Sequence, residues 1–254
     1  MKLWMLLLII VLAVSLEAWS NGSGNAFTNQ PNECDNPPYS VHDWIADQAR
    51  ALLPDEERAW LDPHRTMYLL GTEAPDNSDI PELCGAPNTG YGDWSYDHNT
   101  DTTASWAASR AQDEYDNAVD AFADGDPAAA AYFLGAMAHY VGNMSQYGYA
   151  RTNEVYRADY ERWSEGRAVN LSATMFKSYI KAGDLVRRRP YTAVQRISQA
   201  ASEGQGNILT AERMDALYPE KTAEWYDSIG ASLNLAVNEL ASVLHRFYLN
   251  EVSQ

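Results

Sequence analysis

Apolar residues recur at helical spacing along most of the chain. Near the C-terminus, one such face predicts a long helix that begins close to Pro219. Its apolar positions are Trp225, Ile229, Leu233, Val237, Leu240 and Leu244. No segment alternates for long between apolar and polar residues, which argues against β-strands. The pattern therefore predicts an all-α, single-domain multi-helix bundle of about eight helices.

Capping residues divide the rest of the chain into shorter predicted helices. Ser40, followed three residues later by Asp43, is a capping signal for a helix through Leu53. A short helix opens at Asp62, which precedes a proline, and closes at Gly71. Further helices are predicted over residues 103–125, 127–148, 152–166, 172–183 and 190–204.

The first eighteen residues have the pattern of a secretory signal: one positive charge, a short apolar run, and small residues at the end. Cleavage after Ala18 would leave a mature helical domain, residues 19–254, that begins at Trp19. Because the apolar run is shorter than a membrane-spanning helix and no later segment approaches that length, we expect no transmembrane segment after cleavage. We expect a secreted protein, with the cell envelope and peripheral membrane contact left open. A retained N-terminal anchor is the alternative.

Cysteine content and net charge indicate the disulfide and the partners that can be expected. Cys34 and Cys84, in an exported chain, suggest one disulfide between two loop-rich regions. The formal net charge is −17. An acidic surface repels polyanions, so nucleic acid is an unfavourable partner.

Polar side chains stand out in the apolar stretch AYFLGAMAHYVGNMSQYGY, residues 131–149. His139 and Asn143 lie one helical turn apart and so share a face. In such surroundings, a polar pair that is neither hydrogen-bonded nor bound to a metal lowers the stability of the fold. Asp76 and His98 lie in the Asn-, Asp- and Gly-rich stretch from residue 72 to 101, which is predicted as a long loop.

Several of these residues form an ordered series along the chain: Trp19, His42 in HDWIADQA, Asp76 in LLGTEAPD, His98, and His139 with Asn143. The series resembles the zinc-dependent phospholipase C and S1/P1 nuclease superfamily, whose members are secreted all-helical hydrolases. Their trinuclear zinc site begins at an N-terminal Trp exposed by signal removal. The likeness extends to about Trp163.

The resemblance implies two sets of zinc ligands in this chain. The amino nitrogen and carbonyl oxygen of Trp19, together with His42, would hold one zinc ion. Asp76, His98 and His139 would hold a second ion. Two imidazoles and a carboxylate with open positions form a plausible catalytic zinc arrangement, which lowers the pKa of bound water to about 7. Asp76 is therefore a candidate catalytic residue as well as a ligand.

The chain departs from the family pattern at several positions. Asn143 stands where the family has an Asp that bridges two metals. The neutral amide lacks the negative charge that would offset the repulsion between two nearby dications. Tyr149 and Arg157 stand where the third site has histidines, and of that site Glu161 remains. We therefore expect one or two zinc ions and loss of the third site.

The roles of the substituted residues stay open at this point. Asn143 is either an amide ligand or, as we favour, a hydrogen-bonding spacer. Glu161 is either a metal ligand or the partner of Arg157 one helical turn away. Arg157 is a candidate catalytic residue that grips a phosphate oxygen, because its planar guanidinium matches that geometry, or it is a structural plug.

The resemblance implies a phosphodiester hydrolase of phospholipase C type, in which metal-bound hydroxide attacks a small phosphodiester or a phospholipid headgroup. A nuclease is disfavoured by the acidic surface. The alternative is a catalytically silent relative that keeps the helical scaffold and a partial metal site as an extracellular binding or structural protein.

Overall fold

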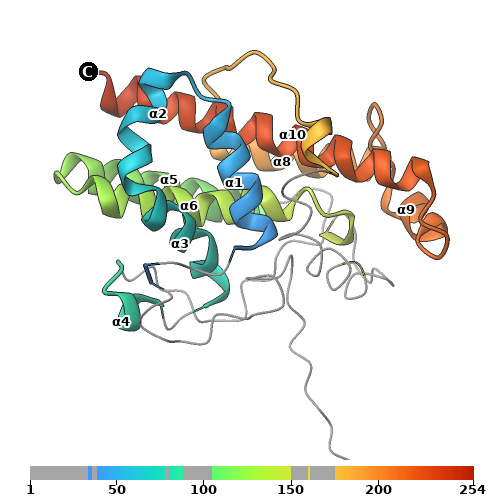
Figure 1. The fold of residues 1–254 in the computed structure, drawn as a ribbon, viewed down its shortest axis with the longest axis horizontal. Helices are drawn as coiled ribbons and strands as arrows, with labels where there is room; N and C mark the ends of the chain where they lie inside the picture. The colour runs from blue at the N-terminus through green and yellow to red at the C-terminus, as the bar shows by residue number, and fades with distance from the viewer. Residues whose placement is uncertain (1–33, 36–38, 78–79, 88–104, 150–159, 161–174) are drawn as a thin grey trace, which may run out of the picture.

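The computed structural model describes residues 34–35, 39–77, 80–87, 105–149, 160 and 175–254. Across these residues the chain forms helices, turns and irregular connections, and none of them belongs to a strand. The prediction of an all-α multi-helix bundle is confirmed (Figure 1). The α-helices are α1 (Val41–Ala51), α2 (Asp55–Leu61), α3 (Arg65–Glu73), α4 (Ile80–Cys84), α5 (Ser105–Ala123), α6 (Pro127–Asn143), α8 (Pro190–Glu203), α9 (Ala211–Leu217) and α10 (Ala223–Phe247).

Short turns of other helical types extend this framework. Turns of 3-10 type are η2 (Asp62–His64), η3 (Ala74–Asp76), η4 (Tyr147–Tyr149) and η5 (Lys177–Tyr179). A π-helical turn, η6 (Tyr248–Val252), continues α10.

The central element is α6. It packs against α3, α5, α1, α8 and α10, and almost all of its residues from Ala129 to Asn143 are buried. In Figure 1, α5 and α6 run between α10 on one side and α3 on the other. A helix that is apolar on every side belongs in the interior of a bundle, and this position puts the polar side chains of α6 there too.

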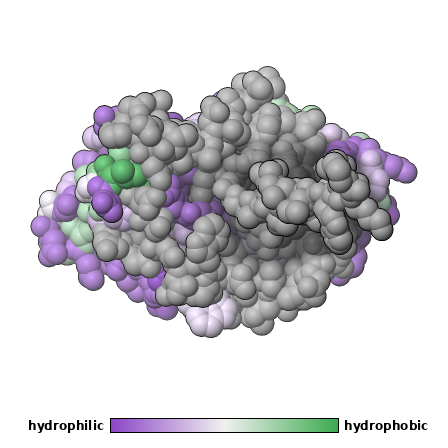
Figure 2. Space-filling view, turned by 90° about the horizontal axis from the view of Figure 1, so that it is seen from below, coloured by the Kyte–Doolittle hydropathy of each residue, from purple (hydrophilic) through white to green (hydrophobic). Residues whose placement is uncertain are grey.

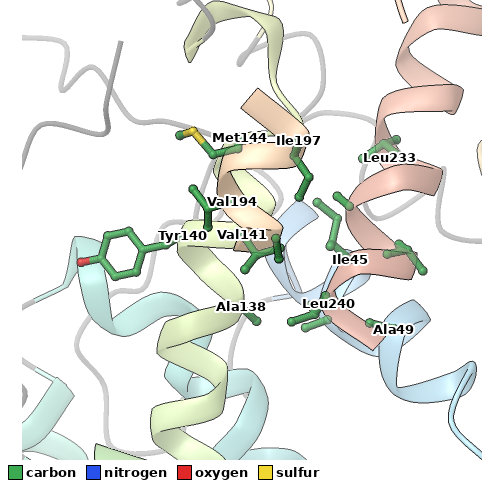
Figure 3. Close-up of a cluster of buried hydrophobic side chains, with 14 of the residues drawn as sticks. Ile45, Ala49, Ala138, Tyr140, Val141, Met144, Val194, Ile197, Leu233 and Leu240 are labelled. Atoms are coloured by element: carbon green, nitrogen blue, oxygen red, sulfur yellow. The ribbon is translucent and has the colours of Figure 1, made fainter. Parts of the chain in front are cut away.

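The main core fills the space between α6 and its neighbours (Figure 3). Ile45 and Ala49 of α1 and Leu233 and Leu240 of α10 are among its buried side chains. Other members are Ala138, Val141 and Met144 from the region of α6, and Val194 and Ile197 from α8. The phenol ring of Tyr140 points away from the others (Figure 3). Tyr140 also belongs to this core, but it extends from α6 toward another side than Ala138 and Val141.

Several predicted helix ends are wrong. Gly71 does not close a helix, because α3 continues to Glu73. Gly71 instead lets α3 approach α6 closely: a Cβ atom added there would lie 2.0 Å from the Tyr132 carbonyl oxygen. The helix predicted over residues 127–148 ends at Asn143, and a turn and η4 follow.

The helix predicted over residues 172–183 is also wrong in its described part, residues 175–183, where η5 leads into extended chain. Side chains of α10 bind this extended segment. Asn234 Oδ1 accepts from the Lys181 N–H at 2.8 Å, and Asn238 Oδ1 accepts from the Gly183 N–H at 2.7 Å. Backbone groups that a helix would pair internally are thus satisfied by α10.

Other sequence-based helix signals hold. The Ser40 capping box is present, with Asp43 Oδ2 accepting from the Ser40 N–H at 2.8 Å, although α1 ends at Ala51, before Leu53. The helix predicted over residues 190–204 is α8, which ends where Gly204 takes a left-handed conformation with φ of 71°. Our prediction did not include α2 and α9, and it was wrong to place all of residues 72–101 in a loop, because Ile80–Cys84 form α4.

A disulfide joins Cys34 to Cys84 at the end of α4, as predicted. Helices in the described ranges are all too short or too polar to cross a lipid bilayer. In Figure 2, the described residues in view are mostly hydrophilic, with a small hydrophobic patch among them.

Candidate functional site

Two histidines and an asparagine meet inside the bundle. The first turn of α1 carries His42, whereas α6 carries His139 and Asn143 one turn apart. The two imidazole rings stack, with centroids 4.2 Å apart and planes inclined by 26°. All three side chains are buried, and His139 and Asn143 have no exposed surface.

Hydrogen bonds link these side chains in a row. His139 Nδ1 lies 2.8 Å from the carbonyl oxygen of Thr72 on α3. Asn143 Nδ2 lies 2.9 Å from His139 Nε2, and Asn143 Oδ1 lies 2.9 Å from His42 Nε2. The row therefore runs from the backbone of α3 through α6 to α1.

Asp76 lies beside this row, at the end of η3. Its Oδ1 atom is 3.7 Å from His139 Nε2, and its side chain keeps 17% of its surface exposed. Two ligands on a tetrahedral zinc ion with bonds near 2.1 Å lie about 3.4 Å apart. The separation of these two atoms is thus close to that of two ligands of one ion, at a position that solvent reaches.

A second buried polar group adjoins the first. It consists of the carboxyl groups of Asp43 and Glu73, both fully buried, with Ser40 and Thr72. Asp43 Oδ2 accepts from Ser40 Oγ at 2.8 Å, and Asp43 Oδ1 lies 3.1 Å from Thr72 Oγ1. Thr72 therefore contacts both groups, with its carbonyl oxygen at His139 and its hydroxyl at Asp43.

The buried carboxyl groups are harder to ionise than usual. Burial raises the pKa of Asp43 to about 6, while hydrogen bonds from Ser40 and Thr72 partly offset the effect. Burial, followed by the neighbouring charge of Asp43, raises the pKa of Glu73 well above its ordinary value. Removal of a carboxylate from water disfavours its charged form. A proton on this carboxyl pair is consequently favoured.

The structure brings together four of the residues singled out from the sequence, His42, Asp76, His139 and Asn143. Trp19, His98, Arg157 and Glu161 lie outside the described residues, and their predicted roles stay predictions. Tyr149, in η4, is fully buried.

Several polar residues of this region were not anticipated. Thr72, Glu73 and the buried carboxyl group of Asp43 were missed, although Asp43 adjoins His42 in the capping box. Thr72 acts through its backbone carbonyl, which carries no signature in the sequence.

A cation also lies near the site. The Arg110 guanidinium is 5.9 Å from the centre of the Tyr140 ring, and its Nη2 donates to Glu114 Oε1 at 2.7 Å. Tyr140 follows His139 in α6, and its ring packs edge-on at 5.4 Å from that imidazole. Burial raises the pKa of the Tyr140 phenol, whereas Arg110 lowers it. Our sequence reasoning did not single out Arg110.

Within the described ranges, no group of three or more His, Cys, Asp or Glu side chains is arranged to hold a metal ion. His98, the third ligand expected from the resemblance, lies outside those ranges. No protein-family model matches this chain, and a search of curated proteins finds no match either. The candidate function is therefore argued from the geometry of this site.

Proposed function

We propose that this protein is a secreted, metal-dependent phosphodiester hydrolase of zinc phospholipase C type, with its centre at His139 and Asp76. The observation that carries the proposal is the orientation of His139. Its Nδ1 atom donates to the Thr72 carbonyl oxygen, which leaves Nε2 unprotonated, 2.9 Å from Asn143 Nδ2 and 3.7 Å from Asp76 Oδ1. A metal-binding histidine typically donates its other ring N–H to a carbonyl or carboxylate in this way.

Burial of the polar cluster supports a functional role. Imidazole and amide groups in a helical core cost stability relative to apolar side chains of similar volume unless each is hydrogen-bonded. His42, His139 and Asn143 occupy positions in the centre of the bundle. Asp76 stands at the solvent-accessible edge of this cluster, where a substrate could approach.

A zinc ion at this position would act as a Lewis acid and would acidify a water molecule. His139 and Asp76 would hold it, and His98 is the further ligand that the sequence resemblance suggests. The Thr72 carbonyl would orient His139. Arg157 remains the candidate for binding a phosphate oxygen, and loss of turnover in Arg157→Ala is the expected result if it has that role.

The net negative charge of the protein favours a small substrate over a long polyanion. The net charge of −17 disfavours long polyanions, so a small phosphodiester or a phospholipid headgroup fits better than nucleic acid. The Cys34–Cys84 disulfide supports secretion, because disulfides persist in oxidising compartments.

The test combines metal analysis with a chromogenic substrate. Purified mature protein should contain zinc by inductively coupled plasma analysis and should hydrolyse bis(p-nitrophenyl) phosphate. EDTA should abolish the activity and added zinc should restore it. His139→Ala and Asp76→Asn should each lower turnover by about 100-fold or more and reduce the metal content.

His64→Ala is the matched control, because His64 lies in η2 and takes no part in the cluster. It should keep both the metal and the activity. Protein that contains no metal and shows no chelator-sensitive hydrolysis would exclude the proposed hydrolase.

One observation favours the silent relative as a second candidate. Asn143 bonds to both imidazoles, so the row of side chains is stabilised by its own hydrogen bonds. In that case the cluster fixes the packing of α1, α3 and α6 in an extracellular binding or structural protein. Metal-free protein that unfolds at the same temperature with and without zinc would support this candidate.

A further inference from the structure

We infer that Asn143 holds the two stacked imidazoles in opposite protonation states at Nε2, with His139 unprotonated there and His42 protonated. His139 is then the cation-binding member of the pair, and His42 is a positioning residue. The inference deepens the proposed function and rests on it where a metal is concerned. The hydrogen-bond pattern that it describes exists without a metal.

The argument starts from the Thr72 carbonyl. A carbonyl oxygen can only accept a hydrogen bond, so the 2.8 Å contact with His139 Nδ1 places a proton on that nitrogen. A neutral imidazole that is protonated at Nδ1 has a lone pair at Nε2. His139 Nε2 is therefore the acceptor for the amino group of Asn143, at 2.9 Å.

The same reasoning then gives the protonation of His42. With its amino group on His139, Asn143 turns Oδ1 toward His42 Nε2, at 2.9 Å. An amide oxygen only accepts, so His42 Nε2 carries a proton and donates. His139 thus has a lone pair at Nε2 that a cation can take in place of the Asn143 amino group, and His42 has none there.

This arrangement gives His42 a supporting role. Its N–H orients the Asn143 amide, and its ring stacks on the His139 ring at 4.2 Å. Both contacts restrict the direction of His139. Partners of this kind commonly change metal affinity by about 10- to 100-fold when removed.

Nitrogen-15 NMR of EDTA-treated protein tests the hydrogen-bond pattern directly. At about pH 7.5, above the ordinary histidine pKa, we expect His139 to be protonated at Nδ1 alone and His42 to be protonated at Nε2. Ring signals are assigned from their loss in His139→Gln and His42→Gln. A proton on His139 Nε2, or an unprotonated His42 Nε2, would overturn the inference.

Zinc titration of the metal-free protein tests the two roles. His42→Gln keeps an N–H donor at about the position of Nε2 but removes the imidazole, whereas His42→Ala removes both. We expect His42→Gln to bind zinc within about threefold of the unmodified protein and His42→Ala to bind about 10- to 100-fold more weakly. If both variants lose zinc equally, His42 is itself a ligand and the inference is wrong.

The two measurements separate this inference from the proposed function. If the unmodified protein binds no zinc, the proposed hydrolase fails, and the NMR measurement alone decides the hydrogen-bond pattern. If zinc binds but the ring protonation differs from that expected, the hydrolase stands and the positioning role of His42 fails.

Discussion

Gly71 and Gly135 face each other where α3 crosses α6. A Cβ atom added to Gly135 would lie 1.9 Å from the Tyr68 carbonyl oxygen and 2.9 Å from the Gly71 Cα atom. One residue beyond Gly71, the Thr72 carbonyl reaches His139, which lies one turn beyond Gly135. The close crossing therefore sets the distance on which the orientation of His139 depends.

Gly135→Ala should destabilise the protein although alanine is the better helix former. Alanine gains about 1 kcal/mol in helix propensity, but its methyl group must push two backbones apart. Overpacking of this kind costs about 1 to 3 kcal/mol or more. We expect a net loss of about 2 kcal/mol in the free energy of unfolding, measured by urea denaturation.

Gly142→Ala is the comparison within the same helix. Its added Cβ atom would meet the His42 Cδ2 atom at 3.3 Å and the Ile45 Cδ1 atom at 3.4 Å, which are side-chain atoms that can move slightly. Its loss of stability should be smaller. Equal stability of Gly135→Ala and Gly142→Ala would contradict the importance of the backbone crossing.

The buried carboxyl pair predicts an unusual dependence of stability on pH. Asp43 and Glu73 have pKa values above their ordinary ones in the folded protein, so their protonated forms favour folding. For Asp43, this contribution is complete below about pH 4 and is lost as the pH rises through about 6, and for Glu73 it is lost as the pH rises through the raised pKa of that carboxyl. For Asp43, a change from 3.8 to about 6 corresponds to about 3 kcal/mol, at 1.4 kcal/mol per pH unit.

Glu73→Gln should weaken this dependence, because glutamine resembles the protonated carboxyl and stays neutral. Urea denaturation at about pH 5 and about pH 8 should show a smaller loss of stability in Glu73→Gln than in the unmodified protein. Glu56→Gln, which removes an exposed carboxyl group, serves as the control and should leave the difference unchanged. An undiminished difference in Glu73→Gln would show that Glu73 does not ionise over this range.

Asn238→Ala should release the extended segment from α10. Asn238 binds this segment through the Gly183 N–H at 2.7 Å and the Lys181 carbonyl at 3.0 Å. Loss of two such bonds removes about 1 to 2 kcal/mol from local stability. We expect trypsin to cleave after Lys181 about tenfold faster, with Gln199→Ala on the surface of α8 as the control. An unchanged cleavage rate would mean that other contacts hold the segment.

His245 and Glu57 should stabilise the contact between α10 and α2. His245 Nδ1 lies 2.8 Å from both carboxyl oxygens of Glu57, whose side chain is 5% exposed. His245→Ala would leave the buried Glu57 carboxyl group without this hydrogen-bond partner, at a cost of about 2 kcal/mol. The double variant His245→Ala with Glu57→Gln should lose less than the sum of the single changes, as measured by a double-mutant cycle. Additive losses would show that the pair is not coupled.

Sequence patterns predicted the helical class because capping residues and helical periodicity act locally. The Ser40 capping box and the Gly204 helix end are both present. Gly71 misled the prediction because a glycine can end a helix or permit a close helix crossing, and only the position of α6 distinguishes the two. The extended segment after η5 was missed for a similar reason, since its hydrogen bonds come from Asn234 and Asn238, more than fifty residues away.

The candidate site was predictable in part. The spacing of His139 and Asn143 placed both on one helical face, and the resemblance to the zinc-dependent phospholipase C superfamily implied that His42 and Asp76 would join them. The structure brings these four side chains together. The Thr72 carbonyl could not be predicted, because a backbone atom has no residue-specific signal and its position depends on how α3 crosses α6.

Thr72 belongs to two polar networks through two different atoms. Its carbonyl oxygen fixes the His139 ring, and its hydroxyl contacts the Asp43 carboxyl. A shift of α3 along its axis would change both contacts. The imidazole row and the acid pair are therefore linked through one residue of α3, so that a displacement of this helix disturbs both.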